Sequence, residues 1–149
     1  MGEKKFNSVL AENRKARHDY TVLETLECGM VLTGTEVKSC RRGEVSLAGS
    51  YAAVLGGELW LEGCDISAYK FGNRFNHDPK SRRKLLVHAK EVRELKMKTE
   101  AKGLTVVPLK MYVKNGRIKL ELGVCRGKAL HDKRDDLKKK ALKRDMERA

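Results

Sequence analysis

The sequence predicts a mainly β protein: a small β-barrel with short helices at its periphery and a flexible basic tail at its C-terminus. Two pairs of short alternating segments each flank a glycine-containing two-residue turn, and a segment between them is rich in helix formers. The length of 149 residues suits one domain with tails. Several short strands, one sparsely apolar helix and many turn glycines are typical of a small barrel rather than a helical bundle.

The clearest local pattern runs from Leu109 to Val124. Asn115-Gly116 interrupts two alternating runs and favours a type I′ turn, because both residue types tolerate a positive φ. Counting outward from the turn predicts core pairs on one face, namely Val113 with Ile118, Met111 with Leu120, and Leu109 with Leu122. The other face is basic and carries Lys110, Tyr112, Lys114, Arg117 and Lys119, with Glu121 opposite Lys110.

Shorter patterns predict the remaining elements. Residues 50–55 and 58–62 flank Gly56-Gly57 and predict a second hairpin. Alternation of Val31, Thr33, Thr35 and Val37 predicts a strand. Residues 89–102 predict a helix that ends before Gly103 and packs on the outside of a sheet through a narrow stripe, Val92 and Leu95.

The two ends of the chain differ from its middle. Residues 1–17 predict a basic N-terminal arm and residues 18–126 the barrel domain. The tail, 127–149, holds nine Lys or Arg against five acids, with too few apolar residues to stabilise a helix alone. We therefore expect the tail to be disordered when free and helical when a partner holds it.

Charge and composition limit the function. With 33 Lys or Arg against 20 Asp or Glu, the net charge of +13 favours a polyanionic partner, either nucleic acid or an anionic membrane. No apolar run approaches the roughly 20 residues that span a bilayer, and residues 1–10 lack a signal-peptide pattern. A cytoplasmic protein without a membrane partner is expected. The four cysteines form no Cys-x-x-Cys pair, which predicts reduced, buried thiols, no metal site and no cofactor.

Enzyme signatures are missing from the sequence. It contains no phosphate-binding glycine loop, no Gly-x-Ser-x-Gly and no His-Glu-x-x-His. His77-Asp78 and His131-Asp132 are adjacent pairs, whose side chains point to opposite sides of a strand. We therefore expect a noncatalytic protein. The alternative from a different functional class is an enzyme: a small barrel nuclease whose metal is held by scattered Asp and Glu.

Basic residues gather in clusters that border the predicted strands and turns. The clusters are Arg14, Lys15, Arg17 and His18; Arg41 and Arg42; Lys80, Arg82, Arg83 and Lys84; Arg117 and Lys119; and Arg126 and Lys128. Lys and Arg neutralise phosphates, and interspersed aromatic side chains can stack on unpaired bases. RNA fits better than duplex DNA, because no predicted helix carries base-reading residues at groove-reading spacing.

Several motifs, in this order along the chain, resemble the small protein B (SmpB) family, the bacterial proteins that bind transfer-messenger RNA, also called SsrA RNA. These motifs are Asn13-Arg14-Lys15-Ala16-Arg17-His18-Asp19-Tyr20, Glu27-Cys28-Gly29, Leu32-Thr33-Gly34-Thr35-Glu36-Val37-Lys38-Ser39, Asp78-Pro79, Arg83-Lys84-Leu85-Leu86, and Gly127-Lys128 through Asp132-Lys133-Arg134. The similarity extends from about residue 6 to the end of the chain.

The resemblance implies an oligonucleotide-binding (OB)-type barrel, a monomer when free, that binds the tRNA-like domain of transfer-messenger RNA. Such a protein delivers this RNA to stalled ribosomes for trans-translation, the rescue process that tags the unfinished peptide. The RNA-contacting positions that the resemblance implies are Asn13, Arg14, Lys15, Arg17, His18, Tyr20, Glu27, Leu86, His88 and Lys119. Glu27 either accepts hydrogen bonds from the RNA or orders nearby cationic side chains, and the sequence leaves both readings open. Leu86 is equally consistent with RNA contact and with ordinary barrel core.

The resemblance also places the tail in the mRNA channel and decoding centre of the small ribosomal subunit. The tail residues implied to contact the ribosome are Lys128, His131, Asp132, Lys133, Arg134, Lys138, Lys139 and Lys140. Ser46, Cys125 and Ala129 depart from residues common in the family. The alternative binding function is that of a ribosomal or initiation-factor-like barrel that contacts ribosomal RNA directly.

Overall fold

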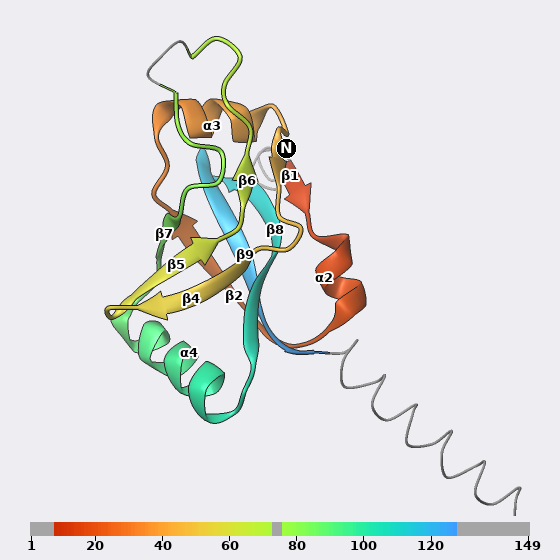
Figure 1. The fold of residues 1–149 in the computed structure, drawn as a ribbon, viewed down its shortest axis with the longest axis vertical. Coiled ribbons are helices and arrows are strands. Elements are labelled where there is room, and N and C mark those ends of the chain that lie inside the picture. Colours follow the sequence, from red (N-terminus) through yellow and green to blue (C-terminus); the bar gives the residue numbers. More distant parts are fainter. Residues whose placement is uncertain (1–7, 73–75, 128–149) are drawn as a thin grey trace, which may run out of the picture.

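The computed structural model describes residues 8–72 and 76–127. Their strands form a closed ring in which β8, β4, β5, β7, β2 and β9 are neighbours in that order and β9 pairs back with β8 (Figure 1). The main strands are β1 (Ser8–Glu12), β2 (Tyr20–Met30), β4 (Tyr51–Leu55), β5 (Glu58–Glu62), β7 (Arg83–Leu86), β8 (Thr105–Lys114) and β9 (Arg117–Gly127). A small separate sheet joins β3 (Val45–Ser46) to β6 (Asp65–Ile66), and the helices are α2 (Arg14–Asp19), α3 (Gly34–Arg41) and α4 (Ala89–Ala101).

This architecture confirms the prediction of a mainly β protein with a few short helices. Figure 1 shows the three helices around the ring of strands, with α3 and α4 at opposite ends of the view. Among the helices of the described ranges, none combines the length and the apolarity that crossing a membrane requires.

The hairpin of β8 and β9 forms as its turn sequence predicts. Asn115 and Gly116 both have positive φ, 52° and 77°, and the predicted pairs Val113 with Ile118 and Met111 with Leu120 are present. The third predicted pair is wrong, because a bulge between Pro108 and Lys110 places Pro108, not Leu109, opposite Leu122. Proline has no backbone N–H to donate to the ladder, and bulges are where a sheet interior tolerates it.

The bulge sends Leu109 into a second core cluster. There Leu109 packs with Ala16 of α2, Val107 and Cys125, apart from the main core. A Cβ atom on Gly123 would come within 2.9 Å of Leu109 Cδ1, so a larger residue at position 123 would force the Leu109 side chain to shift. The cluster anchors α2 to the strands.

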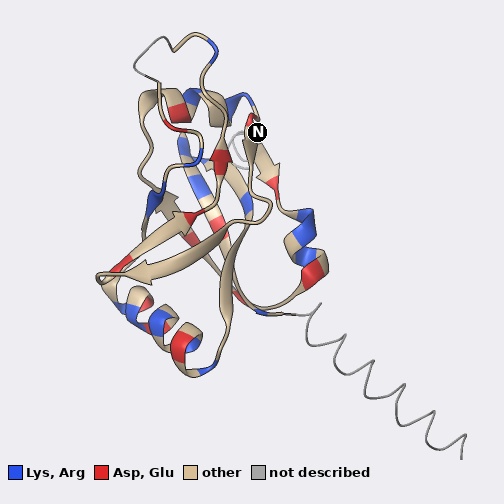
Figure 2. Ribbon diagram, in the orientation of Figure 1, with Lys and Arg blue, Asp and Glu red and all other residues tan. Residues whose placement is uncertain are grey.

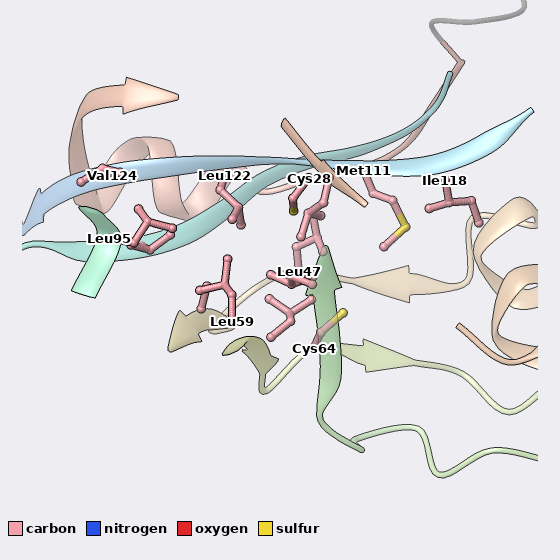
Figure 3. Packing of buried hydrophobic residues seen from close by; sticks show 14 of the residues in the cluster. Cys28, Leu47, Leu59, Cys64, Leu95, Met111, Ile118, Leu122 and Val124 are labelled. Carbon is pink, nitrogen blue, oxygen red and sulfur yellow. The ribbon is translucent and has the colours of Figure 1, made fainter. Parts of the chain in front are cut away.

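The main core fills the space between the strands of the ring (Figure 3). It includes Leu59 and Leu61 of β5, Leu120 and Leu122 of β9, and Leu95 of α4. All four cysteines are unpaired and buried, as predicted. Burial raises the thiol pKa to about 12 for Cys28 and Cys40 and to about 11 for Cys64 and Cys125.

The strand predicted over residues 31–37 is wrong. Strand β2 ends at Met30, and α3 begins at Gly34 with Thr33 as its N-cap. The Thr33 backbone N–H donates to Glu36 Oε1 at 2.8 Å, while Thr33 Oγ1 accepts from the Glu36 backbone N–H at 3.4 Å. This capping box satisfies two free helix-end donors and outweighs the alternating pattern.

The first described residues pack on the ring of strands, and two further predicted elements form as expected. Residues 8–12, expected within a basic arm, form β1 and pair with β8, and residues 14–19 form α2. The second predicted hairpin, β4 with β5, is confirmed. Helix α4 is also confirmed: Val92 and Leu95 are its buried residues, and Gly103 follows it with a φ of 64°.

Candidate RNA interface

Helix α2 presents most of the first group of predicted RNA residues. Arg14, Lys15, Arg17 and His18 are exposed, and Figure 2 shows the basic colour along α2. Arg17 Nη2 lies 3.4 Å from Glu121 Oε1, which links α2 to β9. Tyr20, just after the helix, is half-buried against the second core cluster.

Asn13 differs from its neighbours because it is only 3% exposed. Its Oδ1 accepts the backbone N–H of Ala16 at 3.1 Å, which caps α2. Its Nδ2 donates to the carbonyls of Pro108 at 2.8 Å and Leu47 at 3.2 Å. Both ends of the amide are therefore used inside the protein, and Asn13 fixes where α2 begins.

A second group lies on the outside of β2, β8 and β9. We call it the outer basic face and define it as Glu27, Lys110, Tyr112, Lys114, Lys119 and Glu121. Strand register places Glu121 opposite both Glu27 and Lys110. Because Arg17 reaches Glu121, this face is continuous with α2.

Glu27 is the centre of a hydrogen-bonded group on this face. Its Oε2 accepts the Tyr112 hydroxyl hydrogen, and Lys114 Nζ donates to the same carboxylate at 3.3 Å. The bond from Tyr112, followed by the Lys114 contacts, holds the pKa of Glu27 below its ordinary value of 4.5. Partial burial and this same bond raise the pKa of Tyr112, so its hydroxyl keeps its proton. Lys110 Nζ lies 5.7 Å from the centroid of the Tyr112 ring.

Lys119, Leu86 and His88 meet beside Gly29. Register places Gly29 of β2 opposite Leu86 on one side and Lys119 on the other. Leu86 is 51% exposed, so it does not belong to the barrel core. These residues and the exposed His88 at the start of α4 line one shallow hollow together with Glu27 and Glu91. An apolar side chain beside a lysine offers contact to both a base and a phosphate.

One predicted basic cluster is divided by the fold. Lys80, Arg82 and Lys84 have accessible side chains, whereas the Arg83 side chain is 1% exposed. Arg83 Nε donates to Glu36 Oε2 at 2.6 Å. Its remaining nitrogens donate to the backbone carbonyls of Cys64, Pro79 and Asp78 at 2.7, 2.9 and 3.0 Å. Arg83 is therefore a structural residue and is not available to RNA.

His77, a member of one of the adjacent His-Asp pairs in the sequence, also has internal partners. His77 Nδ1 lies 2.9 Å from Thr35 Oγ1, and Nε2 lies 2.9 Å from the carbonyl oxygen of Ile66. Within residues 8–72 and 76–127, no group of three or more His, Cys, Asp or Glu side chains is arranged to hold a metal ion.

Sequence reasoning missed the connection between Glu27 and Tyr112. Tyr112 falls on the basic side of the predicted hairpin, but nothing local shows that β2 brings Glu27 beside it. The predicted ribosome-contacting residues of the tail lie outside the described residues: Lys128, His131, Asp132, Lys133, Arg134, Lys138, Lys139 and Lys140.

A closed ring of strands with an exposed cationic and aromatic face defines the class of small, basic, β-rich proteins suited to binding RNA. Comparison with known proteins gives the particular family. The family model described as "SmpB protein" matches residues 10–149, and the chain belongs to this family.

Relatives of known name support the same assignment. The SsrA-binding protein of Thermosynechococcus vestitus is 57% identical over 142 residues, covering 95% of this chain and 93% of the relative. That of Staphylococcus carnosus is 52% identical over 147 residues, covering 99% and 94%. A solved chain described as "tmRNA-SmpB: a journey to the center of the bacterial ribosome" matches with a TM-score of 0.66 and 52% identity, covering 78% of this chain and 82% of that one. The resemblance of the sequence to the SmpB family is thus confirmed.

Proposed function

We propose that this protein is a noncatalytic RNA-binding adaptor that binds the tRNA-like domain of transfer-messenger RNA and delivers it to stalled ribosomes for trans-translation. The observation that carries this proposal is the outer basic face, continuous with α2 and flanked by the exposed Leu86. The names of the relatives, SsrA-binding proteins, support transfer-messenger RNA as the ligand. They favour this adaptor over a ribosomal or initiation-factor-like barrel. Its place of action is the cytoplasm, where ribosomes translate.

The fold and its boundaries belong to the same proposal. A closed, antiparallel ring of short strands with loops and short helices at its ends is consistent with an OB-type barrel. Because β1 and α2 pack on β8, the RNA-binding domain proposed here begins at residue 8 rather than 18. The tail, 127–149, is proposed to order in the mRNA channel near the decoding centre.

The chemistry of the face explains how it would hold a folded RNA. Arg17, Lys110 and Lys119 meet phosphates and release their counterions, which contributes affinity without reading sequence. Tyr112 and Leu86 offer flat or apolar surface to bases that are unpaired in the loops of a tRNA-like fold. Shape and exposed loops, rather than base-pair edges, would therefore select the ligand.

Glu27 has a defined task in this scheme. Its carboxylate already accepts hydrogen bonds from Tyr112 and Lys114. Placed directly against the RNA, this negative charge would repel the phosphates. We infer that Glu27 is a positioning residue that fixes the Tyr112 ring and Lys114, rather than a direct RNA contact. The first of the two readings left open by the sequence would require Glu27 to turn away from these partners.

The proposal is tested by the salt dependence of binding to an in vitro transcribed tRNA-like domain. Arg14→Ala combined with Lys119→Ala should weaken binding. It should also reduce the slope of log affinity against log salt concentration by about two, since each lysine or arginine on a phosphate contributes about one to that slope. Lys96→Ala, an exposed lysine on α4 outside the defined face, is the control for loss of a positive charge. An unchanged slope in the double variant would overturn the assignment of the face.

The tail supplies a second arm of the same experiment. A chain that ends at residue 131 should bind the tRNA-like domain with nearly unchanged affinity but fail to support peptide tagging on stalled ribosomes. Equal loss of both activities would place the tail in the primary RNA site instead.

A further inference from the structure

An aromatic pair, half-buried Tyr69 and exposed Phe71, lies on the turn that follows β6, beside α3. The centroids of Tyr69 and Phe71 are 5.6 Å apart, with their rings inclined at 71°. Phe71 is 64% exposed, and the next most exposed aromatic residue of the described ranges is Tyr51 at 47%. Exposing a phenylalanine ring forgoes the free energy that its burial would contribute. The turn therefore presents this ring at a cost to stability.

Three cationic side chains surround the pair. Lys38 Nζ lies 5.4 Å from the Tyr69 ring centroid, while Arg42 Cζ and Lys70 Nζ lie 6.0 and 5.9 Å from that of Phe71. Among the described residues, the ion pair that reaches this group joins Arg42 to Glu44, whose Oε1 accepts from Arg42 Nε at 3.0 Å. Three cations against one carboxylate leave the patch positively charged. We call Lys38, Arg42, Tyr69, Lys70 and Phe71 the aromatic patch.

The turn that carries Tyr69 and Phe71 is held by the side chain of Asn76, which follows the turn in the sequence. Asn76 Oδ1 accepts the Tyr69 backbone N–H at 3.0 Å, and Asn76 Nδ2 donates to the Tyr69 carbonyl oxygen at 2.7 Å. The Gly72 backbone N–H donates to the same carbonyl at 2.9 Å. Farther along, His77 bonds to Thr35 next to the start of α3. These bonds fix the backbone at Tyr69 relative to α3 before any ligand binds, which lowers the entropy cost of binding.

Aromatic rings interleaved with cationic side chains are the arrangement that binds unpaired nucleotides. Here the cations lie over the rings, so a base that stacks on a ring takes the place of the cation above it. A base stacks on the ring face, and its phosphates meet Lys or Arg. A docked protein segment is the less favoured occupant, because the patch offers single rings among charges rather than a continuous apolar groove. The excess positive charge is complementary to a phosphate backbone.

We propose that the aromatic patch is a second RNA-binding site, which takes unpaired nucleotides of ribosomal RNA. This inference rests on the proposed function, in which the outer basic face holds the tRNA-like RNA. The patch lies on α3 and the turn after β6, whereas the outer basic face lies on β2, β8 and β9. A protein that holds one folded RNA on its strands leaves this other surface for the RNA of the ribosome.

The test compares two ligands for the full-length protein: vacant 70S ribosomes and the isolated tRNA-like domain. Phe71→Leu keeps an apolar side chain but removes the stacking surface. It should weaken ribosome binding by about 5- to 150-fold, the range that corresponds to one stacked base, and leave tRNA-like domain binding unchanged. Phe71→Trp is the matched control, which keeps a stacking ring and should retain ribosome binding.

The outcomes separate this proposal from the function on which it rests. Unchanged ribosome binding in Phe71→Leu, or equal loss in Phe71→Trp, would overturn the stacking site. Loss of tRNA-like domain binding instead would assign the patch to transfer-messenger RNA and overturn the ribosomal assignment. Failure of the outer basic face would appear separately, as an unchanged salt slope in the Arg14 and Lys119 double variant. Lys70→Ala, which leaves both rings in place, should reduce the salt slope for ribosomes alone.

Discussion

Two carboxylates of this chain, Glu27 and Glu36, each bind a cationic side chain, but one pair lies at the surface and the other is buried. The Glu36 and Arg83 side chains are 5% and 1% exposed. Those of Glu27 and Lys114 are 38% and 47% exposed. The buried pair also uses the other nitrogens of Arg83 on backbone carbonyls, so little of its hydrogen-bonding capacity is left for a ligand.

The difference in burial therefore gives two chemically similar ion pairs different roles: the buried pair stabilises the fold, and the exposed pair supports the RNA-binding surface. The buried pair connects α3, the segment 64–79 and β7, since Glu36 caps α3 while Arg83 bonds to Cys64 and Pro79. Water cannot compensate a partner lost there, so the pair is important for folding. The exposed pair is solvated, contributes little to stability, and keeps Tyr112 and Lys114 accessible to RNA.

The largest expected effect comes from breaking the buried pair. Arg83→Met should lower the free energy of unfolding by about 3–5 kcal/mol, because it leaves the Glu36 carboxylate buried without its partner. Urea unfolding followed by circular dichroism measures the change. Arg82→Met is the matched control: its pair with Glu62 is exposed on the arginine side, and we expect a loss of about 0–1 kcal/mol. Similar losses in both variants would contradict the division by burial.

An intermediate effect should appear in RNA affinity when the exposed pair is changed. Tyr112→Phe removes the hydroxyl that Glu27 holds, and we expect it to weaken tRNA-like domain binding about fivefold, the worth of about one hydrogen bond. Glu27→Gln should act through the same ring and lysine. The double variant should then lose less than the product of the two single losses. Independent, multiplicative losses would show that Glu27 touches the RNA directly.

The smallest effect is a pH dependence of stability. Because the Tyr112 bond lowers the pKa of Glu27 in the folded protein, its stabilising contribution is complete above the ordinary value of 4.5 and is lost as pH falls through the lowered pKa. Wild type should therefore lose slightly more stability than Glu27→Gln between pH 6 and pH 3. Urea midpoints at the two pH values measure this difference. Parallel losses would mean that the bond between Tyr112 and Glu27 does not persist in solution.

Local chemistry made part of the fold predictable. Asn115-Gly116 determines its own turn through positive φ, and the alternating residues near it follow in register. The same counting fails at Leu109, because a bulge beside Pro108 lies beyond what the turn controls. The helix α3 was also encoded locally, in Thr33 and Glu36, but the alternating pattern over the same residues predicted a strand.

The candidate site was predictable in its residue types and less so in their roles. In the sequence Arg83 is one basic residue among several, and only the packing of α3 against the segment before β7 shows that it is internal. Asn13 resembles a polar contact residue until the carbonyls of Leu47 and Pro108 are seen around it.

By itself the sequence determined the family, the β-rich class, the hairpin turns and the excess of positive charge, since each depends on residue identity or on contacts within a few positions. Tertiary structure decided which charged side chains face solvent and which partners they meet. Glu27 and Tyr112 are 85 positions apart, and Glu36 and Arg83 are 47 apart. Pairing of β2 and β8 with the two edges of β9 brings Glu27 to Tyr112, and packing of α3 against the segment before β7 brings Glu36 to Arg83. Neither contact has a local connection along the chain, so only tertiary structure decides it.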